Sequence, residues 1–136
     1  MSLHLQMRWP LLILVILGAA ATGAAVQQGH PLTGTWTGSW GPDATQRKHL
    51  TFVLSWDGDK VSGTINPGPD AIDLESVGVN LNNWTVRFEG ETKDASGKAV
   101  RVSAEGRIVD LGSIHRTISG TWREGEVTGD FKITRN

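Results

Sequence analysis

Apolar and polar residues alternate along most of this chain from Leu32 onward. In residues 49–56, for example, leucine, phenylalanine and tryptophan occupy every even position, and most of the residues between them are polar. A period of two predicts strands that bury one face. Short turn sequences, such as Asp57-Gly58-Asp59 and Pro67-Gly68-Pro69-Asp70, separate these stretches. The pattern predicts eight antiparallel strands, with a β-bulge near Ser76 where the buried positions change from even to odd numbers.

Four of the expected strands share one short pattern. An apolar residue, a hydroxyl residue, glycine, a polar residue and a large apolar residue follow one another in 32–36, 61–65, 118–122 and 127–131. The spacing is irregular, so the pattern is no tandem repeat. Inward glycines permit the strong coiling of a small barrel and leave space for neighbouring rings. We therefore predict an all-β fold, an eight-stranded antiparallel up-and-down barrel, with a two-sheet β-sandwich as the alternative.

The N-terminus has the order of a secretory signal peptide. Arg8 precedes the apolar run Leu11–Leu17, and small residues follow. The apolar stretch is shorter than the roughly 20 residues of a spanning helix. We expect a signal peptide at 1–25 with cleavage near Ala25, a lead-in at 26–31 and the barrel at 32–136. The protein would then be secreted or periplasmic, without a stable membrane anchor after cleavage; an uncleaved anchor is the alternative.

Charge and cysteine content exclude several classes of partner and chemistry. Removal of Arg8 leaves 12 of the 13 basic residues against 14 acidic ones, a net charge of −2 with the signs interspersed. Nucleic acid is therefore not an expected partner. The chain has no cysteine, which excludes disulfides and thiolate catalysis. His49 and His115 have outward parity, and no nucleophile, metal-ligand or cofactor motif is found. We expect no metal, no cofactor and no enzymatic activity, a barrel enzyme being the less favoured reading.

Three residues are candidates for contact with a small molecule. Trp40 ends its expected strand and Trp84 begins another, so both are placed to line an open mouth. Arg116 has inward parity and could anchor a ligand carboxylate, or could reach solvent instead. These residues predict a non-catalytic barrel that binds a small apolar or amphipathic molecule at its mouth. The alternative is a filled barrel that acts as an envelope structural or inhibitor-like protein-interaction module. The sequence does not predict an oligomeric state.

The two ends of the expected barrel resemble those of the calycins, the lipocalin and avidin group. The motif Gly34-Thr35-Trp36 opens the first strand and Ile133-Thr134-Arg135 closes the last. The resemblance implies that Arg135 packs over the ring of Trp36 and, with Gly34, closes one end of the barrel. The avidin residues that hold biotin are not matched, since Gly38, Pro42 and Ile65 stand at their positions and only Trp84 corresponds. The likeness therefore implies a fold and not biotin binding.

Overall fold

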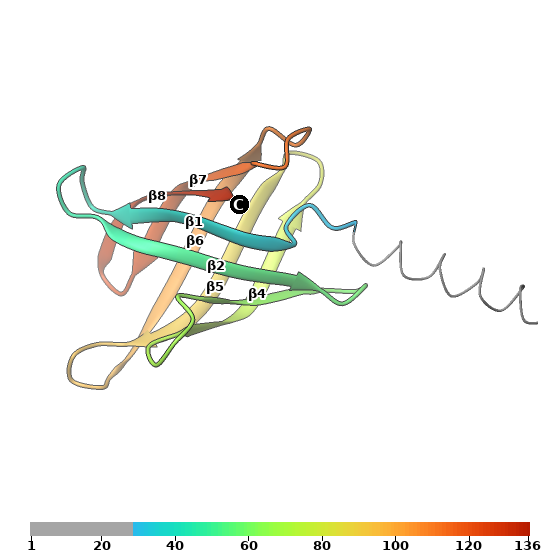
Figure 1. Cartoon of the computed structure of the whole chain (residues 1–136). Helices are drawn as coiled ribbons and strands as arrows, with labels where there is room; N and C mark the ends of the chain where they lie inside the picture. The colour runs from blue at the N-terminus through green and yellow to red at the C-terminus, as the bar shows by residue number, and fades with distance from the viewer. Residues whose placement is uncertain (1–28) are drawn as a thin grey trace, which may run out of the picture. The chain divides into compact units, whose positions relative to one another are not determined.

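The computed structural model describes residues 29–136, and the expected signal peptide at 1–25 lies outside them. The chain divides into two units, 1–30 and Pro31–Asn136, and the second unit is the barrel. Each strand pairs antiparallel with the next, and the last pairs with the first, so the sheet closes. Figure 1 shows this up-and-down path, which confirms the predicted fold class over the sandwich. The strands are β1 (Gly34–Gly41), β2 (Lys48–Trp56), β3 (Val61–Ile65), β4 (Ile72–Asn80), β5 (Thr85–Lys93), β6 (Ala99–Val109), β7 (Thr117–Glu124) and β8 (Val127–Arg135).

On each strand every second side chain points inward, and these side chains fill the inside of the barrel. This is the face that the period-two pattern predicts, and the register of β4 on β5 shifts between Leu74 and Ser76, as the expected bulge requires. The strand β7 begins only at Thr117, and Ile114 lies 66% exposed in the loop before it. The buried apolar residues are Leu32, Trp36, Trp40, Leu50, Phe52, Leu54, Val61, Ile65, Ile72, Val86, Phe88, Val102, Ala104, Ile108, Ile118, Trp122, Phe131 and Ile133.

Inward glycines allow neighbouring strands to approach more closely than a side chain would permit. A Cβ atom added at Gly38 would overlap the Lys132 carbonyl oxygen on β8, and one added at Gly120 would overlap the Glu105 carbonyl oxygen on β6. Gly120 belongs to the pattern that predicted a tightly coiled barrel, and Gly38 has the same effect on the first strand. The barrel is therefore narrow, and its inside is small enough for side chains to fill.

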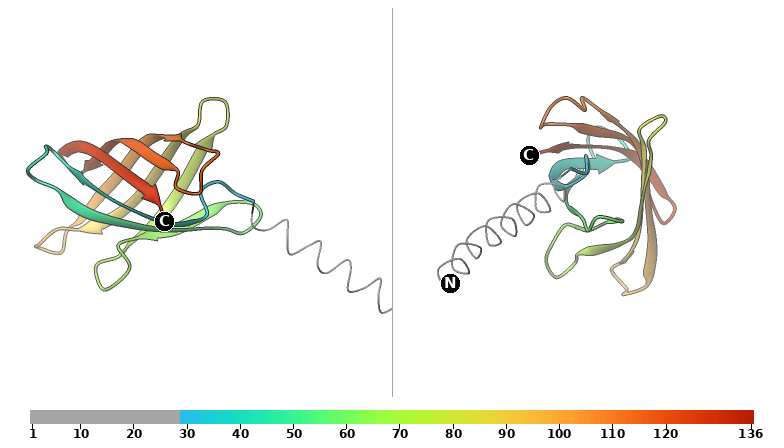
Figure 2. Two further views of the ribbon diagram at one scale, coloured as in Figure 1. Left: turned by 45° about the horizontal axis from the view of Figure 1, so that its top comes forward. Right: turned by 90° about the vertical axis from the view of Figure 1, so that its right-hand side faces the viewer.

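The strand order defines two ends of the barrel, seen along the axis in Figure 2. We call the terminal end the one that holds Pro31–Thr33, the β2–β3 and β4–β5 turns, the β6–β7 loop and the C-terminus. The distal end holds the β1–β2 loop and the β3–β4, β5–β6 and β7–β8 turns. The distal β1–β2 loop and β5–β6 turn project to the left in Figure 1.

The strand β4 has the least regular pairing. It pairs with β3 at only two positions, Thr64 with Asp73 and Ile65 with Ile72. Each of the other seven strand pairs has five to nine positions in register. The closure of the barrel is thus weakest between β3 and β4.

Candidate functional site

The lumen of the barrel is crossed by a chain of aromatic rings. Trp122 on β7 stacks on Trp40 of β1, with ring centroids 5.4 Å apart and an angle of 22° between the planes. Its ring also meets Phe52 of β2 and Phe131 of β8 edge-on, at 6.3 and 6.0 Å. Phe52 continues the chain to Phe88 of β5 at 5.0 Å. Rings from five strands therefore meet inside the barrel, and this packing leaves the middle of the lumen to protein side chains.

Trp40 lies at the distal end and is only 4% exposed. The Lys48 ammonium lies 5.7 Å above the centroid of its ring and 4.0 Å from a carboxylate oxygen of Glu124. A surface groove of about 390 Å³ borders these three residues, and its further lining is Gly41, Pro42, Thr45, Gln46, Arg47 and Val127. The groove lies at the distal mouth of the barrel, since its strand residues Trp40, Lys48, Glu124 and Val127 all belong to the inward-facing set of their strands. We call it the Trp40 groove.

Trp84 lies at the other end of the barrel, in the turn that precedes β5. Its φ of 58° is in the left-handed region, which is rare for a bulky residue. Two backbone hydrogen bonds hold it there: its N–H donates to the Asn80 carbonyl (2.8 Å), and its carbonyl accepts from the Ile108 N–H (2.9 Å). The half-buried indole packs against the core.

Arg116 lies in the β6–β7 loop, one residue before β7 begins. Its Nε donates to the Leu111 carbonyl (3.2 Å) and its Nη1 to the Pro31 carbonyl (2.9 Å). The guanidinium thus ties the loop to the first residues of the barrel. Arg116 and Trp84 are both at the terminal end, whereas Trp40 is at the distal end, so the three predicted ligand contacts cannot share one mouth.

The residues expected to close the barrel, Gly34, Trp36 and Arg135, do lie together. Trp36 and Arg135 are register partners on β1 and β8. The Arg135 guanidinium lies over Gly34, where a Cβ atom would come within 2.8 Å of Nε, and that Nε donates to the Thr33 carbonyl at 2.7 Å. The Trp36 indole N–H donates to the Leu32 carbonyl at 2.9 Å. The contacts that fix this end are therefore hydrogen bonds to main-chain carbonyls, and the cation–π pair of the described residues is Lys48 with Trp40.

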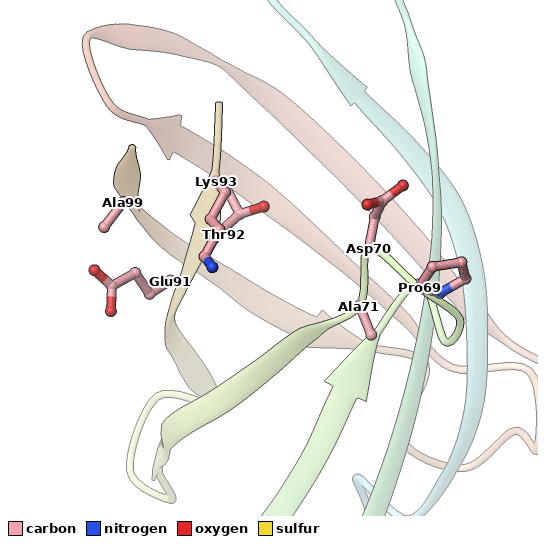
Figure 3. Close-up of a pocket in the computed structure, with 7 residues that line it drawn as sticks. All are labelled: Pro69, Asp70, Ala71, Glu91, Thr92, Lys93 and Ala99. Carbon is pink, nitrogen blue, oxygen red and sulfur yellow. The ribbon is translucent and has the colours of Figure 1, made fainter. Parts of the chain in front are cut away.

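A second distal groove lies where β5 extends beyond β4. The last β5 residue with a β4 partner is Gly90, so Glu91, Thr92 and Lys93 continue beside the β3–β4 turn, paired only with β6. Figure 3 shows these residues and Ala99 on one side, and Pro69, Asp70 and Ala71 on the other. The space between them is about 390 Å³. Both grooves lie at the distal end of the barrel.

Arg47 makes several contacts on the distal surface near the Trp40 groove. Sequence analysis did not identify this residue. Its Nη1 meets an Asp130 carboxylate oxygen at 2.8 Å, and the guanidinium also bonds Ser39 and the Gly41 carbonyl. The Arg47 hydrogen bond is the main reason why the pKa of Asp130 lies below its usual value. The side chain therefore holds the β1–β2 loop against β8.

Neither a metal-binding cluster nor a membrane-spanning helix is found within residues 29–136. No group of three or more histidine and acidic residues lies close enough together there to hold a metal ion. No helix in that range is long and apolar enough to cross a membrane. Comparison with known protein families, curated proteins and solved structures finds no match for this chain. The structure therefore defines the class of this protein by its fold alone, as a closed eight-stranded antiparallel β-barrel.

Proposed function

We propose that this protein is an exported, non-catalytic barrel that acts through its outer surface as a protein-interaction module. The observation that carries the proposal is the ring chain from Trp40 through Trp122 and Phe52 to Phe88, which occupies the space where an enclosed ligand would sit. A filled barrel of this kind offers its partners only rims, grooves and strand edges. Of the two alternatives predicted from the sequence, the surface-acting module is the better supported.

The features of the outer surface agree with this proposal. Two surface depressions on the barrel wall, beside Thr121 and beside Gly78, are lined mostly by outward residues of the strands. Export is proposed from residues 1–25 alone, and N-terminal sequencing of the mature protein should find its first residue near Val26.

Photo-crosslinking in the source cells tests the proposal. A photoreactive amino acid would replace Thr121 or Thr64, both outward-facing, in the full-length protein. We expect a discrete covalent adduct with a protein partner from at least one position. Native mass spectrometry of the purified protein supplies the opposing result: a co-purifying small molecule at one equivalent, with no crosslinked partner, would refute a surface-acting module.

The Trp40 groove favours a second candidate, binding of a small amphipathic molecule at the distal rim. The groove combines the Trp40 indole with two cations, Arg47 and Lys48, and the Glu124 carboxylate, a lining typical of small-ligand sites. Titration with anilinonaphthalene sulfonate would measure it. Binding that is weakened at least tenfold by Lys48→Glu, and unchanged by Lys132→Glu on the outer face of β8, would support this candidate.

A further inference from the structure

The seam between β3 and β4 leaves two strand edges facing each other without a ladder. Beyond the pairs of Thr64 with Asp73 and Ile65 with Ile72, Val61–Gly63 pair only with β2, and Ser76–Asn80 pair only with β5. Natural proteins usually cover, shorten or charge such edges, because unpaired strands accept other chains. The β4 stretch Val77-Gly78-Val79 carries neither charge nor proline.

The register shows which peptide groups point into the seam. In an antiparallel ladder the N–H and C=O groups of successive residues point alternately to the two neighbouring strands. The Ile108 N–H bonds the Trp84 carbonyl and the Asp94 N–H bonds the Lys98 carbonyl, so even-numbered β5 residues point to β6 and odd-numbered ones to β4. The β4 partners of odd-numbered β5 residues are Ser76, Gly78 and Asn80. The peptide groups of Val77 and Val79 therefore point away from β5, toward β3.

The same reasoning applies to β3. The Asn66 N–H bonds the Thr51 carbonyl, which continues the β2–β3 ladder and places the peptide groups of Ser62 and Thr64 toward β2. Val61 consequently presents its N–H and C=O to the seam. One extended chain lying between Val61 and the Val77–Val79 edge could hydrogen-bond on both sides.

The side chains around the seam indicate what such a chain would carry. The inner side of the seam is apolar. Val77 and Val79 of β4 pack against the core, and so do Trp56 and Trp84 at the terminal end of the barrel. The outer side of the seam is open, since a Cβ atom added at Gly78 would meet nothing within 4 Å. Exposed acidic residues border both strands: Asp57 and Asp59 lie in the β2–β3 turn, and Asp73 and Glu75 lie on β4. The basic residues near them are Lys60, the Arg101 that pairs with Glu75, and the Arg87 beside Gly78, which pairs with Glu89. Alternating apolar and basic residues match this surface.

We propose that the β3–β4 seam binds one extended peptide segment of a partner protein, with apolar residues turned inward and lysine or arginine outward. The inference rests on the surface-acting function proposed above and assigns it a site. A second copy of this chain is a poorer occupant, because its β4 would bring its own β5 into a space bounded by β3. The partner segment would add a ninth strand and complete the pairing of β4.

Amide hydrogen exchange of the isotopically labelled full chain tests the site. In the free protein the amides of Val77 and Val79 should exchange at least tenfold faster than that of Gly78, which the β4–β5 ladder protects. The probe is the synthetic peptide acetyl-Lys-Val-Lys-Val-Lys-amide. Its addition should slow exchange at Val77 and Val79 and shift their resonances together with that of Val61.

Three controls separate strand addition from nonspecific attraction. A peptide with glutamate in place of lysine should bind at least tenfold more weakly, and so should one with N-methylated valines. Val79→Pro removes an N–H that β5 does not use, so it should weaken peptide binding more than Val79→Ala, which loses the same core packing but keeps the N–H. If Val79→Pro does not fold, the N-methylated peptide tests the same hydrogen bonds from the other side.

The outcomes distinguish the site from the function. Equal binding of the basic, acidic and N-methylated peptides would overturn the proposed site, as would protection of Val77 and Val79 that grows with protein concentration alone. If the peptide leaves the seam unaffected while crosslinked partners form at Thr121, the seam is refuted and the surface-acting function stands. If the peptide binds as expected, the seam is supported, whatever partner the crosslinks identify.

Discussion

Two buried tryptophans differ in one respect that predicts opposite effects of the same substitution. Trp36 and Trp122 are both fully buried. The Trp36 indole N–H donates to the Leu32 carbonyl at 2.9 Å, whereas the Trp122 Nε1 finds no hydrogen-bond partner among residues 29–136. Phenylalanine in place of either residue removes the indole N–H and some ring volume. The substitutions therefore share a packing cost and differ in the hydrogen bond.

The expected difference follows from these two situations. Loss of roughly 40 Å³ at about 24 cal/mol per Å³ costs about 1 kcal/mol in both variants. Trp36→Phe also loses a hydrogen bond worth about 1 kcal/mol, for a total near 2 kcal/mol. Trp122→Phe removes an unpaired buried donor, which restores about 1–3 kcal/mol. Trp122→Phe should thus be neutral or stabilising, and the two variants should differ by about 2–4 kcal/mol.

Urea unfolding followed by far-UV circular dichroism measures the difference without depending on tryptophan emission. With a slope of about 2 kcal/mol per molar urea, the midpoints should be separated by about 1–2 M. The slopes themselves should agree, since both variants keep the same fold. Equal midpoints, or a lower midpoint for Trp122→Phe, would show that the indole N–H groups do not decide the stability of these positions.

Three further predictions concern the barrel wall and its surface. Gly38→Ala should prevent folding or cost more than about 3 kcal/mol, because the new methyl group would overlap the Lys132 carbonyl oxygen, whereas Gly78→Ala should fold normally in the same thermal melt. Arg47 lowers the pKa of Asp130 in the folded state. The ionised Asp130 therefore contributes to folding stability above the unfolded pKa near 3.9, and this contribution is lost as the pH falls through the lowered folded pKa. Asp130→Asn should therefore flatten the acid limb of stability against pH, and unchanged acid dependence would contradict this. Arg135→Met should lower the unfolding midpoint, through loss of the hydrogen bond to the Thr33 carbonyl, more than Arg87→Met on the outer face does; equal shifts would argue against a closing role.

The sequence predicted the barrel well because alternation reports burial directly. Leu50, Phe52 and Leu54 face inward as their parity requires, and the change of parity near Ser76 corresponds to a real bulge. Turn sequences marked the strand ends for a similar reason: the Asp57 carboxylate, for example, accepts hydrogen bonds from the N–H groups of the next residues in its turn.

The same reasoning could not assemble the candidate site. Parity gives the face of a strand but not the end at which a residue lies, and Trp40 and Trp84 prove to be at opposite ends. Parity also fails outside strands, where Arg116 turns to the carbonyls of Leu111 and Pro31. The open edge of β4 depends on how many residues β3 can pair with, and no local sequence signal reports this.

The stacked pair of Trp40 and Trp122 gives the protein an optical signature. Two indoles 5.4 Å apart, with planes inclined by 22°, are close enough for their electronic transitions to couple. The chain contains no tyrosine to overlap with them. The part of the near-ultraviolet circular dichroism signal that Trp40→Phe removes should therefore report on the inside of this barrel. Whether a partner at the rim or the seam disturbs the lumen could be followed by that signal in unmodified protein.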